Sequence, residues 1–260
     1  MKLIFVLLLT SSLILASEDK KTKIQPRIYG GYRAKPYTVL YIVGIVLAES
    51  FTSSLEFGAG TVISNQWVLT VGTLLKYRFL ELHLGSRRAW WGYKIARIYK
   101  ENYYIHPNKL HDVGLIKCPY MKFSDRLHRA RIPPIPVRDD RYVGNLTLIC
   151  GWGKRDRQSK LEKWLQCIHV VIMSNEECAK IYPQLRTWNV CTSGEGEKGI
   201  CEGDIGGPVV TISDRPILVG IIHILSGCKG SWPSIHIRTS DHLNWIRSKS
   251  NVYFDSFFGR

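Results

Sequence analysis

The chain has 260 residues, of which 45% are hydrophobic and 22% are charged. This composition is typical of a globular protein and excludes a disordered, fibrous or low-complexity chain. The length allows one large domain or two small ones. The formal net charge of +15 at pH 7 favours contact with a polyanion, such as a heparin-like glycan, nucleic acid or an acidic protein, although it can also serve solubility alone.

The first residues have the pattern of a secretory signal peptide over residues 1–16. A lysine precedes an apolar run at 3–16, which is shorter than the about 20 residues that a bilayer span needs. A membrane anchor is the alternative interpretation. Residues 17–27 are polar and end in Arg27, as expected of a propeptide or linker. No later stretch reaches spanning length, so we expect the mature chain to be secreted and extracellular, with no membrane span.

Short apolar runs of β type then follow at regular intervals, each bounded by glycine, proline, asparagine or serine. This pattern predicts an all-β sandwich or barrel. The expected strands are 38–48, 59–64, 67–72, 80–85, 93–100, 146–153, 167–173, 208–212, 217–225 and 234–239. The proline-rich segment 126–144 is expected to connect two halves of the fold. Residues 239–250 combine a capping serine or aspartate with a partial apolar face, which predicts a terminal helix.

The cysteines and one sequon fit the expected extracellular compartment. Seven cysteines leave at least one unpaired when the others form disulfides. They show neither the spacing nor the neighbouring histidines of a zinc site. The sequence NLT makes Asn145 a glycosylation candidate.

The stretch CEGDIGGPVV, residues 201–210, is the most informative part of the sequence. Its glycines and proline predict a tight turn that leads into a strand. Turns of this kind often expose one reactive side chain. The exposed position here holds Ile205, which carries no polar side-chain atom.

Seven motifs resemble, in order, segments of the chymotrypsin-like (S1) serine proteases. They are PRIYGGYRAKPYTV, ISNQWVLTVGTLL, HDVGLIK, ICGWG, CEGDIGGPVV, VGIIHIL and LNWI. The resemblance runs roughly from Ile28 to Ser248. It implies an all-β fold of two packed six-stranded antiparallel β-barrels with a C-terminal helix. The expected S1-like domain spans residues 28–250, and 251–260 form a tail.

The resemblance places the family's catalytic triad on Thr73, Asp112 and Ile205, so only the aspartate matches. Ile205 has no oxygen with which to attack a carbonyl carbon, and the hydroxyl of Thr73 does not titrate near pH 7, so it cannot serve as the base. We therefore expect an inactive homologue of the family that acts as a binding or regulatory protein. Its expected partners are active extracellular proteases, their substrates or their inhibitors. A polyanion-binding secreted protein is an alternative, and the oligomeric state is not indicated.

An active serine-type endopeptidase with an unorthodox site is the remaining alternative. In that hypothesis Thr73 is the nucleophile, His223 the base and Asp112 the group that orients it. The expected oxyanion donors near Gly203 would then face the wrong atom. In a simpler hypothesis, His223 donates a hydrogen bond to Asp112 and satisfies a carboxylate that lacks its usual histidine.

The resemblance also identifies a specificity pocket and an activation site. The pocket positions are Gly199, His223, Leu225 and Ser234. Gly199 offers no charge, and Leu225 is expected to obstruct the pocket. The activation site is the Arg27–Ile28 bond, whose cleavage would free an amino group to pair with Asp204. An inherited site that is never cut is equally compatible with the sequence.

Three disulfides follow from the resemblance. Cys178–Cys191 and Cys201–Cys228 match bridges of the family, and Cys150–Cys167 matches a bridge of some arthropod-type members. The family's bridge beside the histidine is replaced by Gly58 and Leu74, and Cys118 is left unpaired. The segment 86–100 is rich in basic and aromatic residues, which suggests either a polyanion or protein contact or a half-buried strand. Because residues 82–100 contain no carboxylate, we expect no calcium there, and we expect no other cofactor or metal.

Overall fold

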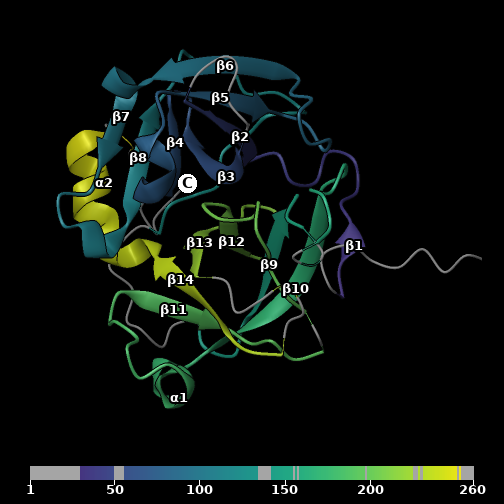
Figure 1. The fold of residues 1–260 in the computed structure, drawn as a ribbon, viewed down its shortest axis with the longest axis vertical. Coiled ribbons are helices and arrows are strands. Elements are labelled where there is room, and N and C mark those ends of the chain that lie inside the picture. The colour runs from purple at the N-terminus through teal and green to yellow at the C-terminus, as the bar shows by residue number, and fades with distance from the viewer. Residues whose placement is uncertain are drawn as a thin grey trace, which may run out of the picture.

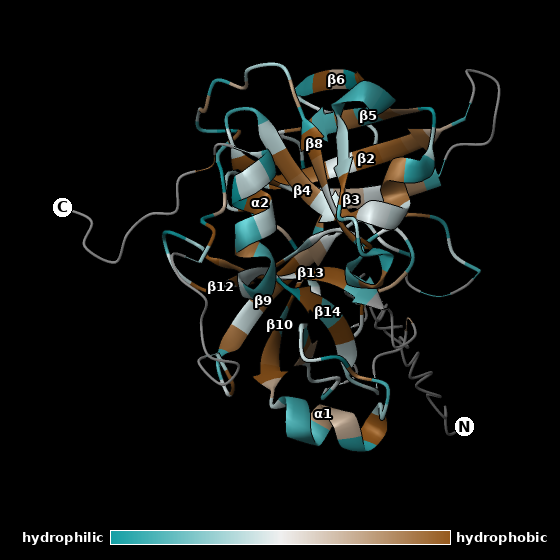
Figure 2. Cartoon of the chain, turned by 90° about the vertical axis from the view of Figure 1, so that its left-hand side faces the viewer, coloured by the Kyte–Doolittle hydropathy of each residue, from teal (hydrophilic) through white to brown (hydrophobic). Residues whose placement is uncertain are grey.

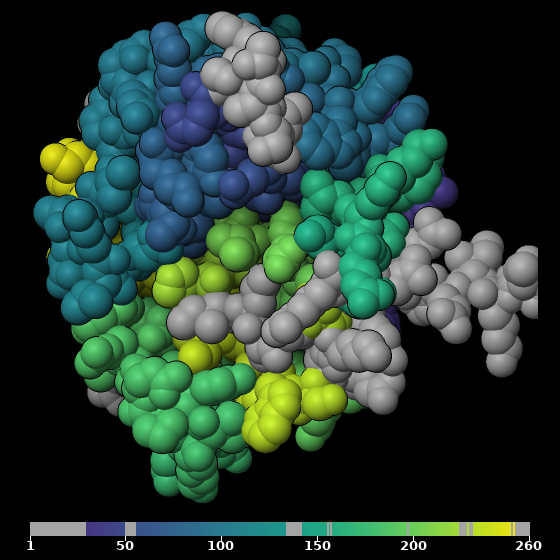
Figure 3. Space-filling view, viewed as in Figure 1, coloured from purple at the N-terminus to yellow at the C-terminus, as the bar shows by residue number. Residues whose placement is uncertain are grey.

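The computed structural model describes residues 30–49, 56–133, 142–154, 156, 158–196, 198–224, 228, 231–250 and 252. Within them the chain forms two antiparallel sheets of seven strands each. Figure 3 shows that most of the N-terminal half of the chain lies in one half of the molecule and most of the C-terminal half in the other, while the yellow C-terminal end packs beside the first half (Figure 1). Contacts between the two sheets therefore join segments that are far apart in the sequence.

The first sheet has the strand order β6-β5-β2-β3-β4-β8-β7 (Figure 1). Its strands are β2 (Ile42–Ala48), β3 (Glu56–Ser64), β4 (Trp67–Val71), β5 (Phe79–Leu84), β6 (Lys94–Tyr99), β7 (Tyr103–Ile105) and β8 (Val113–Lys117). It has one strand more than expected, because the three residues of β7 pair with β8. All seven residues of β2 are buried, as its continuous apolar sequence predicts.

The second sheet has the strand order β1-β10-β11-β14-β13-β12-β9, and an additional β9–β10 pairing closes a ring of six strands. Its strands are β1 (Tyr32–Arg33), β9 (Leu146–Gly151), β10 (Gln166–Met173), β11 (Asn189–Thr192), β12 (Pro208–Thr211), β13 (Leu218–Ile224) and β14 (Ser234–Arg238). The short β1 is added to the ring at β10. The predicted architecture of two packed antiparallel barrels is confirmed.

Helices occupy the connections and the end of the described chain. The α-helices are α1 (Asn175–Ile181) and α2 (Leu243–Lys249), and the 3-10 helices are η1 (Gly72–Lys76), η2 (Lys100–Asn102), η3 (Lys109–His111) and η4 (Thr239–His242). The predicted terminal helix is confirmed by α2. None of the helices in the described ranges is long and apolar enough to cross a membrane.

An apolar cluster joins the two sheets, and we call it the seam. It combines buried side chains from both sheets and from α2, among them Leu69, Val113, Val210, Ile221 and Ile246. Figure 2 shows the apolar strands that meet there. Leu74 and Ile205 are partly buried and pack against the same cluster. The turn at 201–210 is therefore attached to the middle of the molecule.

Candidate functional site

The turn that carries Ile205 is tied by backbone hydrogen bonds to strands of both sheets. Ala59 N, on β3, donates to Ile205 O at 2.8 Å, and Gly206 N donates to Ile222 O, on β13, at 2.8 Å. Gly206 has a φ of 84°, and a Cβ added to it would lie 2.2 Å from Thr70 Oγ1. Because only glycine tolerates both conditions, the turn keeps its shape whatever residue stands at position 205.

Asp112 lies at the end of η3 with a φ of 47° and is 8% exposed. Its Oδ1 accepts a hydrogen bond from Thr73 N at 2.7 Å, and its Oδ2 accepts one from Thr73 Oγ1 at 3.1 Å. His223 Nε2, on β13, lies 3.1 Å from the same Oδ2. The expected contact between His223 and Asp112 is therefore present, and three polar groups meet at one carboxylate.

The proton positions follow from these partners. His223 Nε2 faces a carboxylate oxygen, so it carries a hydrogen and donates it. His223 Nδ1 is buried and has no hydrogen-bond partner in the described part of the chain. The hydroxyl of Thr73 donates to Asp112 rather than to the imidazole, so in this arrangement His223 is not positioned to take the proton of Thr73.

The comparisons with known proteins assign the chain to a family. The model of the trypsin family matches residues 28–246. The chain belongs to the trypsin family. It is 30% identical over 246 residues to Serine protease 1 of Drosophila melanogaster, which covers 89% of this chain and 88% of that protein.

A second relative and a solved structure extend this similarity. Collagenase of Hypoderma lineatum is 26% identical over 236 residues, with 88% of this chain and 89% of that protein covered. A solved structure described as HL collagenase has the same fold, with a TM-score of 0.78 at 24% identity over 87% of this chain and 100% of that one. The members of the trypsin family named here are proteases, so the residues at the catalytic positions decide how far this chain departs from them.

Asp204 is buried beside the turn and is held by backbone N–H groups. Its Oδ1 accepts from Gly153 N at 2.7 Å and its Oδ2 from Cys201 N at 3.0 Å. A Cβ added to Gly151 would lie 1.9 Å from Oδ1, so the carboxylate fills the space that this glycine leaves. Burial raises the pKa of Asp204 to about 6. Its expected partner, the amino group of Ile28, and the preceding Arg27 lie outside the described residues.

The expected pocket and oxyanion positions lie along the same turn and on β14. Gly199 and Gly203 are buried, and Gly203 has a φ of 99°. Ser234 begins β14 and is 6% exposed. Leu225 lies outside the described residues, so its effect on the pocket stays a prediction.

The three disulfides of the described chain join Cys150 to Cys167, Cys178 to Cys191 and Cys201 to Cys228, as the family resemblance implied. Cys118 is unpaired and buried, and burial raises the pKa of its thiol to about 12. Where the family has a further bridge, a Cβ added to Gly58 would lie 2.6 Å from Leu74 Cδ1. The side chain of Leu74 thus occupies the space beside Gly58.

The structure also describes the glycosylation candidate Asn145 and the basic, aromatic segment 86–100. Asn145 is exposed and lies just before β9, where its side chain is accessible. In the segment 86–100, β6 exposes part of its side chains, including Ile95 and Tyr99. Among the described residues, no group of three or more histidine, cysteine or acidic side chains is placed to hold a metal ion.

Sequence reasoning missed a cluster of rings that adjoins Asp112. His111 Nδ1 lies 2.8 Å from His242 Nε2, and the ring of His111 stacks on Trp188 with centroids 4.3 Å apart and on His106 at 4.6 Å. Burial lowers the pKa of His242 to about 4. His111 and His242 are 131 residues apart in the sequence, so no local pattern could have paired them.

Proposed function

We propose that this protein is a secreted trypsin-family member without peptidase activity, which acts as a binding or regulatory protein in an extracellular proteolytic cascade. The observation that carries the proposal is Ile205. It stands at the nucleophile position of the family, it has no atom that can attack a carbonyl carbon, and its side chain packs against the seam.

The neighbouring groups support the same conclusion. In a related triad enzyme, loss of the nucleophile or of the base costs about 10⁶-fold in kcat, which corresponds to roughly 8 kcal/mol of barrier. Here the nucleophile position and the base position both differ from the family, since Ile205 replaces the nucleophile and Thr73 replaces the base. The hydroxyl of Thr73 is already engaged by Asp112 Oδ2 at 3.1 Å, so it is neither free nor activated.

The rival hypothesis is a peptidase that uses Thr73, His223 and Asp112. It draws on the meeting of these groups at one carboxylate oxygen. It requires the imidazole to turn, so that a lone pair of His223 faces the hydroxyl of Thr73. The two hypotheses differ in whether any turnover depends on Thr73.

The experiment starts from protein secreted by animal cells, whose N-terminus is sequenced first. A start at Ile28 would support the proposed secretion and activation cleavage, after which the new amino group is proposed to pair with Asp204. The purified protein is then incubated with a fluorogenic peptide library and with a fluorophosphonate probe of activated hydroxyl groups. We expect neither turnover nor labelling, while an active trypsin in the same buffers gives both.

Thr73→Val and His223→Phe variants, purified in the same way, serve as matched controls. Turnover that both variants retain comes from a contaminating hydrolase and leaves the proposal standing. Turnover or labelling that either variant abolishes would show an enzyme and overturn the proposal. The regulatory part of the proposal predicts that the protein changes the rate at which an active protease of the same family cleaves a macromolecular substrate.

A further inference from the structure

A cavity of about 280 Å³ lies apart from the Asp112 site, and we call it the arginine pocket. Its walls are formed by the segment 36–40, the turn 85–88, Arg126 and Trp164. The volume lies just below the roughly 300–1,000 Å³ of small-molecule sites. None of the residues that line it takes part in the contacts of Asp112.

The walls of the arginine pocket are held by backbone hydrogen bonds between distant segments. Leu165 N donates to Arg87 O at 2.6 Å, Ala89 N donates to Lys163 O at 3.0 Å, and Ala34 N donates to Leu165 O at 2.9 Å. These bonds attach the turn 85–88 to the residues just before β10 and to the segment after β1. The pocket is therefore built on a fixed framework.

Among the described residues, positive charge lines this pocket and no carboxylate does. Arg87, Arg88 and Arg126 are the only charged residues among those that line it. Arg87 donates to Ala34 O at 3.0 Å, which fixes its direction. Arg88 has a buried Nε with no hydrogen-bond partner among the described residues.

Aromatic rings hold the guanidinium groups in place. The guanidinium of Arg33 lies 3.6 Å from the centroid of the Trp164 ring, and that of Arg88 lies 5.4 Å from the same centroid. Arg126 lies 5.1 Å from the centroid of Tyr93. Cation–π contacts of this kind orient the planar guanidinium groups.

We propose that the arginine pocket binds a sulfated glycan through one of its sulfate groups. Guanidinium groups bind tetrahedral oxyanions through paired N–H donors, and such charge-assisted hydrogen bonds are stronger than neutral ones. The net charge of +15 attracts a polyanion from a distance. This proposal does not rest on the loss of peptidase activity, because the two sites share no residue.

The arrangement of the rings favours a glycan over a single-stranded nucleic acid. Non-specific single-strand binding uses successive free aromatic faces on which bases stack. Here guanidinium groups lie over Trp164, Trp91 and Tyr93. Tyr37, which is 59% exposed and lines the pocket, offers one ring, which is enough to pack against a single sugar unit.

The test compares two double variants that each remove two positive charges. Arg88→Gln/Arg126→Gln changes the arginine pocket, and Lys180→Gln/Arg186→Gln changes two exposed residues of the other barrel. Binding of a heparin hexasaccharide to the mature chain is measured by calorimetry at several salt concentrations. The desulfated hexasaccharide and an oligothymidylate of equal charge serve as reference probes.

We expect the pocket variant to lose affinity for the heparin hexasaccharide about 100-fold, since each charge-assisted hydrogen bond contributes about tenfold. Its slope of log Kd against log salt should fall by about one to two. The control variant should change by less than about threefold, because it alters only the screened long-range field. The desulfated probe should bind wild-type protein weakly.

Three results would overturn the proposal: an equal loss in the control variant, equal binding of the desulfated probe, or tighter binding of the oligothymidylate that the pocket variant also loses. The last would indicate a nucleic-acid site. Because Arg88 is partly buried, the single variant Arg126→Gln is measured as well. Arg126 is exposed, so its replacement leaves folding intact and must by itself weaken binding about tenfold.

Discussion

The oxygen Oδ2 of Asp112 allows a quantitative test of the structure, because two side chains donate to it. Thr73 Oγ1 and His223 Nε2 each lie 3.1 Å from this oxygen. The substitution Thr73→Val removes the first donor with little change of shape, and His223→Phe removes the second. We predict that the two substitutions together destabilise the protein by more than the sum of their separate effects.

The magnitude follows from how many donors remain. In each single variant Oδ2 keeps one donor, so the loss should be about 1 kcal/mol of unfolding free energy. In the double variant no donor remains on Oδ2, and the side chain of Asp112 is only 10% exposed. Leaving this oxygen buried and unpaired should add about 1–2 kcal/mol beyond the sum, which is the range of coupling between residues in one network.

The assay is urea unfolding of the four proteins of the cycle, followed by tryptophan fluorescence. The double variant should also melt on the order of 10 °C below wild type. As a control, Thr73→Val is combined with Thr192→Val, whose hydroxyl lies 2.8 Å from His236 Nε2 in the other barrel. The effects of these two substitutions on the unfolding free energy should add to within about 0.5 kcal/mol. Additivity of Thr73→Val and His223→Phe within the same limit would refute the shared-oxygen argument.

Two further predictions concern buried titratable groups. Burial lowers the pKa of His242 to about 4 from its ordinary value of 6.5, so the unfolded chain takes up a proton between these values and the folded chain does not. The unfolding free energy of the wild type should therefore fall as pH drops from about 6.5 towards 4. Over this range the unfolding free energy of the wild type minus that of His242→Gln should decrease by on the order of 3 kcal/mol. A difference that stays constant with pH would contradict this prediction. Burial raises the pKa of Cys118 to about 12, so iodoacetamide at pH 8 should label this thiol at least about a thousandfold more slowly in native protein than in urea; comparable rates would show that the thiol is accessible.

The barrels could be predicted because their strands carry their own signals. The long strands β2, β3, β10 and β13 are apolar runs bounded by turn residues, and all lie within or close to the expected ranges. The short strands β1, β7 and β11 have two to four residues each, too few to show a period. They form because long-range pairing supplies their hydrogen bonds, as in the pairing of Asn189 with Ile237.

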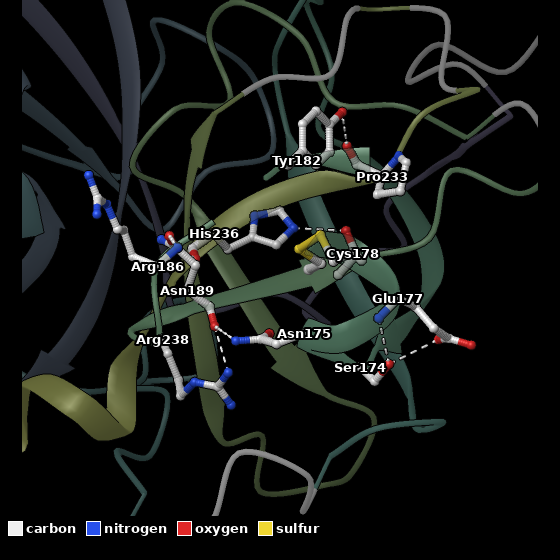
Figure 4. Close-up of a disulfide and its surroundings, with 12 residues drawn as sticks. Ser174, Asn175, Glu177, Cys178, Tyr182, Arg186, Asn189, Pro233, His236 and Arg238 are labelled. Carbon is white, nitrogen blue, oxygen red and sulfur yellow. Dashed lines mark hydrogen bonds between the residues drawn. A yellow bond between two sulfur atoms is a disulfide. The ribbon is translucent and has the colours of Figure 1, made fainter. Parts of the chain in front are cut away.

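The helix α1 was missed although its sequence contains a start signal. Ser174 and Glu177 have the spacing of a capping box, and Ser174 acts as the N-cap: its Oγ accepts from Glu177 N at 3.1 Å and donates to Glu177 Oε2 at 3.2 Å (Figure 4). The helix has only seven residues, so it gave no clear apolar periodicity. The disulfide from Cys178 to Cys191 links this helix to β11. Helix propensity depends on the local sequence alone, so it does not include this long-range constraint.

The candidate site was predictable only through the resemblance. Thr73 and Asp112 are 39 residues apart, and their contact follows from the neighbouring strands β4 and β8. The contact of His223 with Asp112 was proposed from the same alignment of motifs. The stacking of His111 on Trp188 was not, because Trp188 lies outside the family motifs and nothing in either local sequence indicates the other.

The contacts around the site differ between Asp112 and the apolar residues that lie beside it. The side chains of Ile205 and Leu74 pack against the seam. Each Å² of apolar surface that they bury stabilises the folded protein by about 25 cal/mol. Asp112 differs from them, because its carboxylate accepts from the backbone and side chain of Thr73 and from His223. Replacing it with an apolar residue would remove the acceptor of these hydrogen bonds, each of which contributes about 1 kcal/mol at this partly exposed site. An aspartate at this position therefore stabilises the fold through contacts that do not depend on any reaction.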